Sequence, residues 1–172
     1  MSIEIYPEDF STRYGMTHAI SITMTAFYND IGKLMLVAPI DVHNIQALKV
    51  GNVIYDTDRK LTYILVNVKI DTSYRRITAN GYTAEAILNR RVASQKTKIT
   101  NIESGVYEAV TGNLRGLESR IQTAPVKGLE EIYQGDDETT KDVDESVVYG
   151  GQLLDELTPV LEYGELGRRM LW

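Results

Sequence analysis

Lys60–Val92 reads KLTYILVNVKIDTSYRRITANGYTAEAILNRRV, and it decides the fold that we expect. Apolar residues alternate through Leu61–Ile70, which is typical of a strand with one buried face. The residues expected to share that face are Ile64, Val66, Val68 and Ile70. A turn and a second strand at 74–79 follow, and then a short helix at 83–92 with Thr83 as its N-cap. This pattern contains no reactive arrangement, so it predicts an architectural unit.

The sequence before this stretch also indicates antiparallel strands. Residues 19–28 alternate between apolar and hydroxyl side chains, as a half-buried strand does. A turn at Asn29–Gly32 leads to an apolar strand at 33–38, so the two strands predict a hairpin. A short strand at 53–55 precedes the long one. Closely spaced strands over 1–80 predict a β-barrel or a β-sandwich.

The sequence after the stretch is mixed. Region 97–128 includes a predicted helix at Ser104–Leu114, in which two glycines are unfavourable. Region 130–147 is rich in acids and poor in apolar residues, and it predicts a solvated loop. A last helix is expected at 152–163, kinked or restarted at Pro159. The fold class is therefore α+β, with antiparallel barrel-like or sandwich-like subdomains, two or three short helices and a single domain over 1–172.

Composition excludes several classes of protein. The chain has 172 residues, enough for one self-sufficient core, and a formal net charge of −6, which argues against general nucleic-acid binding. It has no cysteine, so disulfides and thiolate metal sites are excluded. The acidic N-terminus lacks the apolar run of a signal peptide, and no apolar stretch is long enough to span a membrane. We expect synthesis and folding in a cytoplasm.

Candidate chemical groups are few, and each has a simpler interpretation. Asp136–Glu138 lacks the spacing of a calcium loop and is expected to be solvated. Asp56 and Asp58 flank Thr57 between two strands, where aspartates commonly cap turns. His18 and His43 stand outside any zinc or acid–base pattern. The prediction is no catalytic residue, no metal site and no cofactor.

Two arginine pairs are the most positive local features. Arg75 and Arg76 lie at the start of the second strand of the stretch, and Arg90 and Arg91 end its helix. The simplest interpretation is that they are solvated element ends. The functional alternative is an interface in which they form salt bridges with an acidic surface of another subunit, such as region 130–145. The eleven tyrosines of the chain are scattered, so they predict no stacking platform.

Several segments together resemble the siphophage tail-tip and baseplate hub family. This family includes the N-terminal region of tail-associated lysins and the Gp37-like siphovirus tail proteins. The resemblance rests on IEIY at Ile3–Tyr6, DIGKLMLVAP at Asp30–Pro39, ITANGYTAEAILNRRV at Ile77–Val92 and GGQLLDELTPVLEYGELGRRM at Gly150–Met170. These segments extend over most of the chain.

The resemblance implies a structural subunit without chemistry of its own, built from barrel-like subdomains with helical insertions. It implies self-assembly into a ring at the tail tip, as a trimer in this family, with contacts to the distal tail protein and other tail-tip proteins. The protein would then be made in the cytoplasm of a host bacterium and reside in the virion.

Two other functions remain open from the sequence. One is a carbohydrate- or ligand-binding β module, which would need a row of exposed aromatic side chains on one sheet face. The other is a hydrolase that uses carboxylates such as Glu4, Asp56 or Asp71. Glycoside hydrolysis would need two of them at a spacing of ~5–10 Å.

Overall fold

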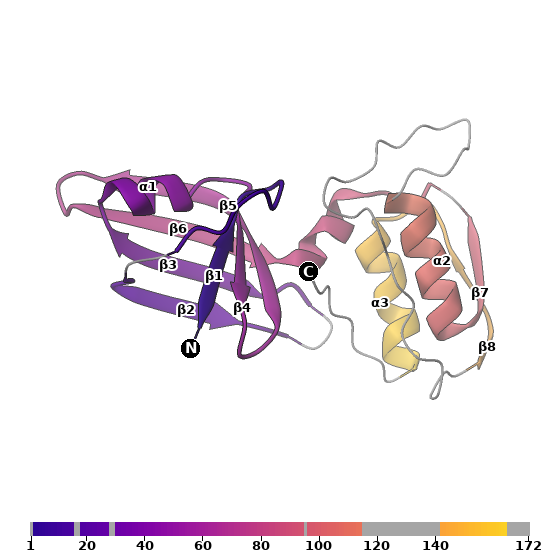
Figure 1. The fold of residues 1–172 in the computed structure, drawn as a ribbon. Helices are drawn as coiled ribbons and strands as arrows, with labels where there is room; N and C mark the ends of the chain where they lie inside the picture. The colour runs from indigo at the N-terminus through magenta and orange to yellow at the C-terminus, as the bar shows by residue number, and fades with distance from the viewer. Residues whose placement is uncertain (1, 16–17, 28–29, 95, 115–141, 165–172) are drawn as a thin grey trace. The chain divides into compact units, whose positions relative to one another are not determined.

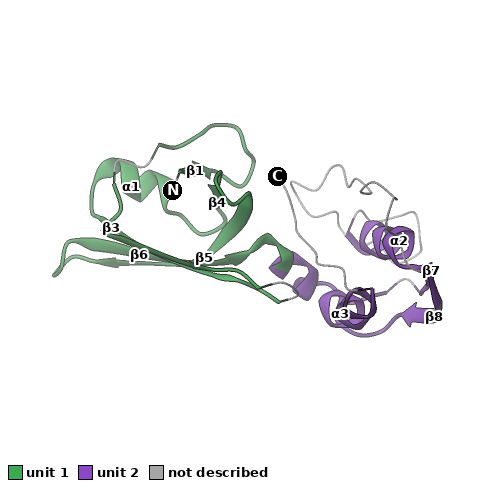
Figure 2. Cartoon of the chain, turned by 90° about the horizontal axis from the view of Figure 1, so that it is seen from below, with its two compact units in different colours: residues 1–85, 169–172 green, residues 86–168 purple. Residues whose placement is uncertain are grey.

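The chain divides into two compact units in a computed structural model. Unit 1 comprises residues 1–85 with 169–172, and unit 2 comprises residues 86–168 (Figure 2). The structure describes residues 2–15, 18–27, 30–94, 96–114 and 142–164. Each unit is described by itself. The single domain that we expected over 1–172 stays a prediction.

Unit 1 contains a six-stranded antiparallel sheet that curls into a half-barrel (Figure 1). Its strands are β1 (Ile3–Tyr6), β2 (Ser21–Thr25), β3 (Lys33–Pro39), β4 (Val53–Asp56), β5 (Leu61–Asp71) and β6 (Arg76–Thr83). Their order is β1-β4-β5-β6-β3-β2, so β1 and β2 form the two edges. The predicted hairpin of β2 and β3 is present, with Ile22 opposite Leu36.

The core of unit 1 lies on one face of this sheet. Alternating residues of β3 lie in register with β6 on that face, where Leu36 is opposite Ala79, and both are fully buried. A short helix that the sequence did not reveal, α1 (Val42–Ala47), adds Ala47 to the same core. The Asp41 side chain begins α1, because it accepts a hydrogen bond from the Asn44 amide (2.7 Å).

The side-chain alternation of β5 changes at a β-bulge. The register with β6 shifts between Leu65 and Asn67, so Val66 is the extra residue. Leu65 is buried and Val68 packs against the same core, although the two are three positions apart. The prediction that Ile64, Val66, Val68 and Ile70 share one face is therefore wrong. The bulge also explains why Leu65 interrupted the sequence pattern.

Thr83 ends β6 and does not cap an α-helix. Its hydroxyl accepts a hydrogen bond from the Gly32 amide (3.0 Å), and its own amide donates to the Gly32 carbonyl (3.0 Å). Because this side chain is bonded to a distant strand, the expected N-cap is wrong. The helical stretch that follows is a 3₁₀ helix, η1 (Ala84–Arg90).

Unit 2 packs two helices against a two-stranded sheet. The strands are β7 (Thr97–Asn101) and β8 (Asp142–Val148), and the helices are α2 (Ile102–Leu114) and α3 (Leu153–Tyr163). Gly105 lets α2 approach β7 closely, since a Cβ there would lie 2.7 Å from Ile99 Cγ2. The glycine that seemed unfavourable for the helix is thus needed for its packing.

Two expectations for unit 2 are corrected, and for the last helix the restart at Pro159, one of two alternatives, is excluded. Residues 142–147, expected in the acidic loop, belong to strand β8, and the remainder of that loop lies outside the described residues. α2 begins at Ile102, two residues earlier than predicted, and the Asn101 side chain accepts from the Ser104 amide (3.2 Å). α3 is one helix with Pro159 inside it. The expected α+β class, antiparallel sheets with short helices, is confirmed.

Candidate protein interface

Arg75 and Arg76 lie at the exposed tip of the β5–β6 hairpin. The Asp71 side chain shapes this turn by accepting from the Tyr74 amide (3.1 Å). Arg75 has a φ of 49°, and its carbonyl accepts from the Ile40 amide (3.1 Å), which ties the turn to the segment after β3. The tip is therefore held by the hairpin and by its neighbour, and it presents two cations to solvent.

An aromatic side chain accompanies these cations. Arg76 Cζ lies 4.9 Å from the centre of the Tyr74 ring, within cation–π distance. Tyr74 in the turn is 72% exposed, and Ile70 near the end of β5 is 51% exposed. Tyrosine and arginine are enriched at the centres of protein interfaces. We define the hairpin tip as Lys69, Ile70, Tyr74, Arg75 and Arg76.

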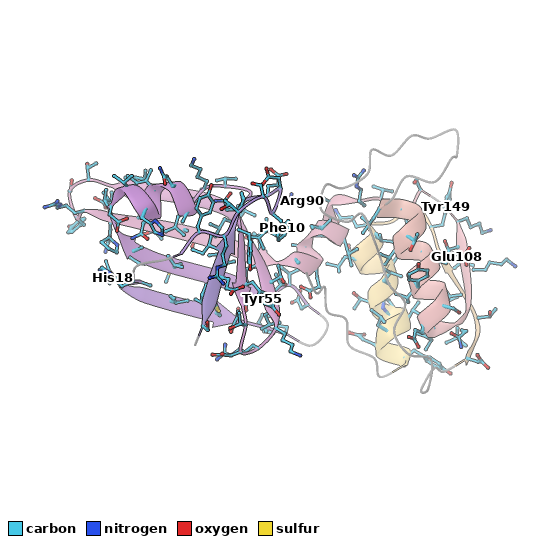
Figure 3. All side chains as sticks on the ribbon, viewed as in Figure 1. Phe10, His18, Tyr55, Arg90, Glu108 and Tyr149 are labelled. Carbon is cyan, nitrogen blue, oxygen red and sulfur yellow. The ribbon has the colours of Figure 1, made fainter. Side chains whose placement is uncertain are left out.

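The second arginine pair belongs to unit 2 and has a different environment. Arg90 is exposed at the end of η1, where Figure 3 labels it, whereas Arg91 is half-buried. The Arg91 carbonyl accepts from the Leu153 amide (2.8 Å), which satisfies one of the free N–H groups at the start of α3. The structure thus brings Arg75 and Arg76 together in one surface feature and assigns Arg91 a backbone role in unit 2.

The two units differ in charge. Unit 1 contains nine acidic and nine basic residues, whereas unit 2 contains fifteen acidic and nine basic ones, so unit 2 carries the whole net charge of −6. Its helices α2 and α3 include no lysine or arginine. Their acids are Glu103, Glu108, Asp155, Glu156 and Glu162. Three of these, including Glu108 in Figure 3, are exposed, so the exposed charged side chains of the two helices are all negative.

Glu4, one of the three carboxylates considered for hydrolysis, is bonded to its neighbours. It accepts from the Tyr6 hydroxyl (2.6 Å) and forms a salt bridge with Arg13 (2.7 Å). The Tyr6 hydrogen bond, with Arg13 beside it, lowers the Glu4 pKa below its ordinary value. The same hydrogen bond raises the pKa of Tyr6. The ionised Glu4 carboxylate therefore has a structural role, because it links β1 to Arg13 in the segment that follows it.

Asp56 and Asp71 both shape turns. Asp56 is buried at the end of β4, and its Oδ1 accepts from the Asp58 and Arg59 amides (3.1 and 3.3 Å). This agrees with the turn that Asp56 and Asp58 predicted. The Asp71 side chain accepts from Tyr74, as described above. Their contacts give Glu4, Asp56 and Asp71 local structural roles and do not join them in one site.

The histidines and tyrosines form no constellation in the part of the chain that the structure describes. His18 is exposed, and His43 is exposed on α1 rather than in a strand or loop. Among the described residues, no three His, Cys, Asp or Glu side chains are grouped so that they could hold a metal ion. Four tyrosines of the described residues are exposed, and they lie on separate elements: Tyr74 in the hairpin tip, Tyr82 on β6, Tyr149 directly after β8 and Tyr163 on α3. These four tyrosines therefore do not repeat along one strand face.

Of the hairpin tip, the sequence alone singled out only Arg75 and Arg76. It placed Lys69 and Ile70 in the long strand and Tyr74 at the start of the second strand. The signal that could have identified them is the hairpin spacing itself, because a turn at 72–75 places Tyr74, Arg75 and Arg76 side by side at its end.

The described helices are too short or too polar to cross a membrane.

The fold defines the class of protein: an α+β chain with an antiparallel half-barrel sheet, whose β5–β6 hairpin tip exposes basic and aromatic side chains. Its family is shown by a match over residues 2–171 to the model described as "Siphovirus ReqiPepy6 Gp37-like protein". The chain belongs to this siphovirus Gp37-like family. The family predicted from the sequence is thereby confirmed.

A solved structure has a similar fold. It is a prophage tail protein, gp18, from Listeria monocytogenes EGD-e, with a TM-score of 0.61 and 10% sequence identity. The similarity covers 94% of this chain and 45% of that one, so the chain spans less than half the length of its structural neighbour. A search of curated proteins gave no match.

Proposed function

We propose that the chain is a structural subunit of a phage or prophage tail tip or baseplate hub and that it has no chemistry of its own. The observation that carries this proposal is the family match over residues 2–171. The fold shared with a prophage tail protein supports it. So do Glu4, Asp56 and Asp71, whose carboxylates serve local structure.

The proposed assembly is a ring of copies, a trimer, that also contacts the distal tail protein and other tail-tip proteins. In this proposal 1–172 acts as one hub-like domain, and the arginines Arg75, Arg76, Arg90 and Arg91 contribute to the interfaces. A contact between a basic feature of one copy and an acidic surface of the next is heterologous, and such a contact forms a ring when the rotation between copies closes.

The charges suggest which surfaces meet. The hairpin tip combines Lys69, Arg75 and Arg76 on unit 1, while α2 and α3 of unit 2 carry acids only. We propose that the tip of one subunit contacts the α2–α3 surface of its neighbour. Such a contact steers association by complementary charge and is weakened by salt.

Two experiments test the function. Antibody labelling of virions viewed by electron microscopy should place the protein at the tail tip, and its absence from purified virions would contradict the proposal. Light scattering coupled to size-exclusion chromatography should give the mass of a trimer. A monomer at all accessible concentrations would contradict self-assembly but would leave a tail location open to the labelling experiment.

A further inference from the structure

Strand β2 is an edge without the usual protection. Edge strands offer unpaired backbone groups, and proteins commonly protect them with charged side chains, proline or a covering segment. Residues 19–27, AISITMTAF, contain neither a charged residue nor a proline. β2 lies at the end of the strand order, next to β3 only. The free edge of β2 can therefore form backbone hydrogen bonds with an added strand.

The other edge strands of the described chain differ from β2 in this respect. β1 carries Glu4, and its outer side is bridged by Tyr14, whose amide donates to the Ile5 carbonyl (2.7 Å). β7 carries Lys98, and β8 begins with Asp142. A charged side chain on a pairing edge loses hydration when a strand adds there. The lack of charge on β2 is thus a property of this edge and not of the sheet strands in general.

Apolar side chains around β2 are left incompletely covered. Ile22 and Met24 pack against the core but are only half-buried, and among the described residues no further strand pairs with the outer side of β2. Ile20 and Phe27, which flank the strand, are 62% and 57% exposed. An added strand with apolar residues at alternate positions would extend the core face and bury this surface.

We propose that this added strand is β2 of a second copy, paired antiparallel about Thr23. In this register Thr23 lies opposite Thr23 of the partner subunit, and Ile22 lies opposite Met24 of the partner subunit. Ser21 then lies opposite Thr25 of the partner subunit. Every apolar position meets an apolar one on the core face, and every hydroxyl position meets another on the outer face, as favourable cross-strand pairs require.

Self-complementarity selects a second copy as the occupant. A strand without charge can pair with itself without repulsion or loss of a charge's hydration, and a two-fold contact uses the same patch on both subunits. The contact goes beyond the proposed tail function and uses a surface other than the hairpin tip. Two short strands bury less than the ~1,200 Å² of a standard interface, so the dimer is expected to be weak and concentration-dependent.

The test uses the full chain with charges placed at the centre of the proposed pairing. Thr23→Lys and Thr23→Glu each place like charges opposite one another in the dimer, so each variant should associate about tenfold or more weakly than the wild type. A mixture of the two variants places opposite charges together and should recover association. Sedimentation velocity up to about millimolar concentration measures each case.

Asn67→Lys is the matched control. Thr23, Met35, Asn80 and Asn67 form one cross-strand row, so Asn67 lies on the same face of the sheet but on the interior strand β5. Its replacement should leave association unchanged, and circular dichroism should show native folding for all the variants. A wild type that stays monomeric, a Thr23→Lys variant that associates normally, or a mixture that fails to recover would each overturn the proposal.

Discussion

The guanidinium of Arg76 lies against the ring of Tyr74, with Cζ 4.9 Å from its centre, on a hairpin tip whose turn is fixed by Asp71 and Ile40. An aromatic ring held beside a cation reduces the side-chain entropy that association must still remove. The Arg76–Tyr74 pair should therefore lose less side-chain entropy on association than two isolated arginines would.

Reversing the charges of the tip should weaken self-assembly. Arg75→Glu combined with Arg76→Glu is expected to lower association strongly while leaving the fold intact, because both side chains are exposed. Light scattering at rising salt measures the effect, since the wild type should dissociate with salt more steeply than the variant. Lys49→Glu with Lys60→Glu is the control, because it changes the charge equally at exposed sites elsewhere on unit 1.

Arg90→Glu tests whether the second pair takes part in the same assembly. Arg90 is exposed, so its reversal should weaken association without unfolding unit 2. Changing Arg91 is less informative because Arg91 is half-buried. Normal assembly of Arg90→Glu would show that Arg90 does not contribute to the interface.

Gly105→Ala should destabilise unit 2. The new Cβ would lie 2.7 Å from Ile99 Cγ2, and such overpacking costs about 1–3 kcal/mol. Hydrogen exchange of β7 and α2 amides reports this loss locally. In an Ile99→Ala background the same substitution should cost less, because the two nearest clashing atoms, Cγ2 and Cγ1, are gone. An equal cost in both backgrounds would show that the close approach is not the cause.

Asn113→Ala should loosen the connection between α2 and the segment before β7. The buried Asn113 side chain accepts from the Ser94 amide (2.9 Å) and donates to the Ala109 carbonyl (2.8 Å). Removing it leaves buried backbone groups without that partner, at a cost of about 1–3 kcal/mol. Urea unfolding measures the change. Asn67→Ala, at an exposed position, should have little effect.

The hydrogen bond between Glu4 and Tyr6 predicts that the stability of the fold depends on pH. Folding lowers the Glu4 pKa, so its stabilising effect is present above the unfolded pKa and is lost as the pH falls through the folded value. Folding raises the Tyr6 pKa, so that contribution is lost only at high pH. Tyr6→Phe should raise the Glu4 pKa, which NMR titration of its carboxyl carbon measures. Tyr55→Phe, on the neighbouring strand, should leave most of the shift in place.

Local patterns predicted much of the fold. The alternation of residues 19–28 and the apolar run of 33–38 identified β2 and β3, because each pattern reflects burial within its own strand. The apolar face of α3 was equally local. The strand β8 was missed because its acids obscure the alternation, and α1 was missed because it is only six residues long.

The errors arose where a distant partner decides the structure. Thr83 looks like a helix cap, yet its hydroxyl is bonded to Gly32, 51 residues away. The extra residue in β5 is defined only by the strand beside it. The arginine pairs were identified correctly as exposed charges at Arg75, Arg76 and Arg90, but only the turn geometry adds Tyr74 to the surface.

The bulge at Val66 also determines how the β5–β6 hairpin can be aligned. On either side of this residue the odd and even positions of β5 exchange faces, so the strand has two halves of opposite parity. A shift of the register by one residue would move the buried side chains of both halves to the opposite face. A shift by two residues would separate the bulge from Gly81. Gly81 is needed there because a Cβ at this position would lie 2.7 Å from the Ile64 carbonyl oxygen. The bulge residue Val66 therefore restricts the β5–β6 hairpin to a single register.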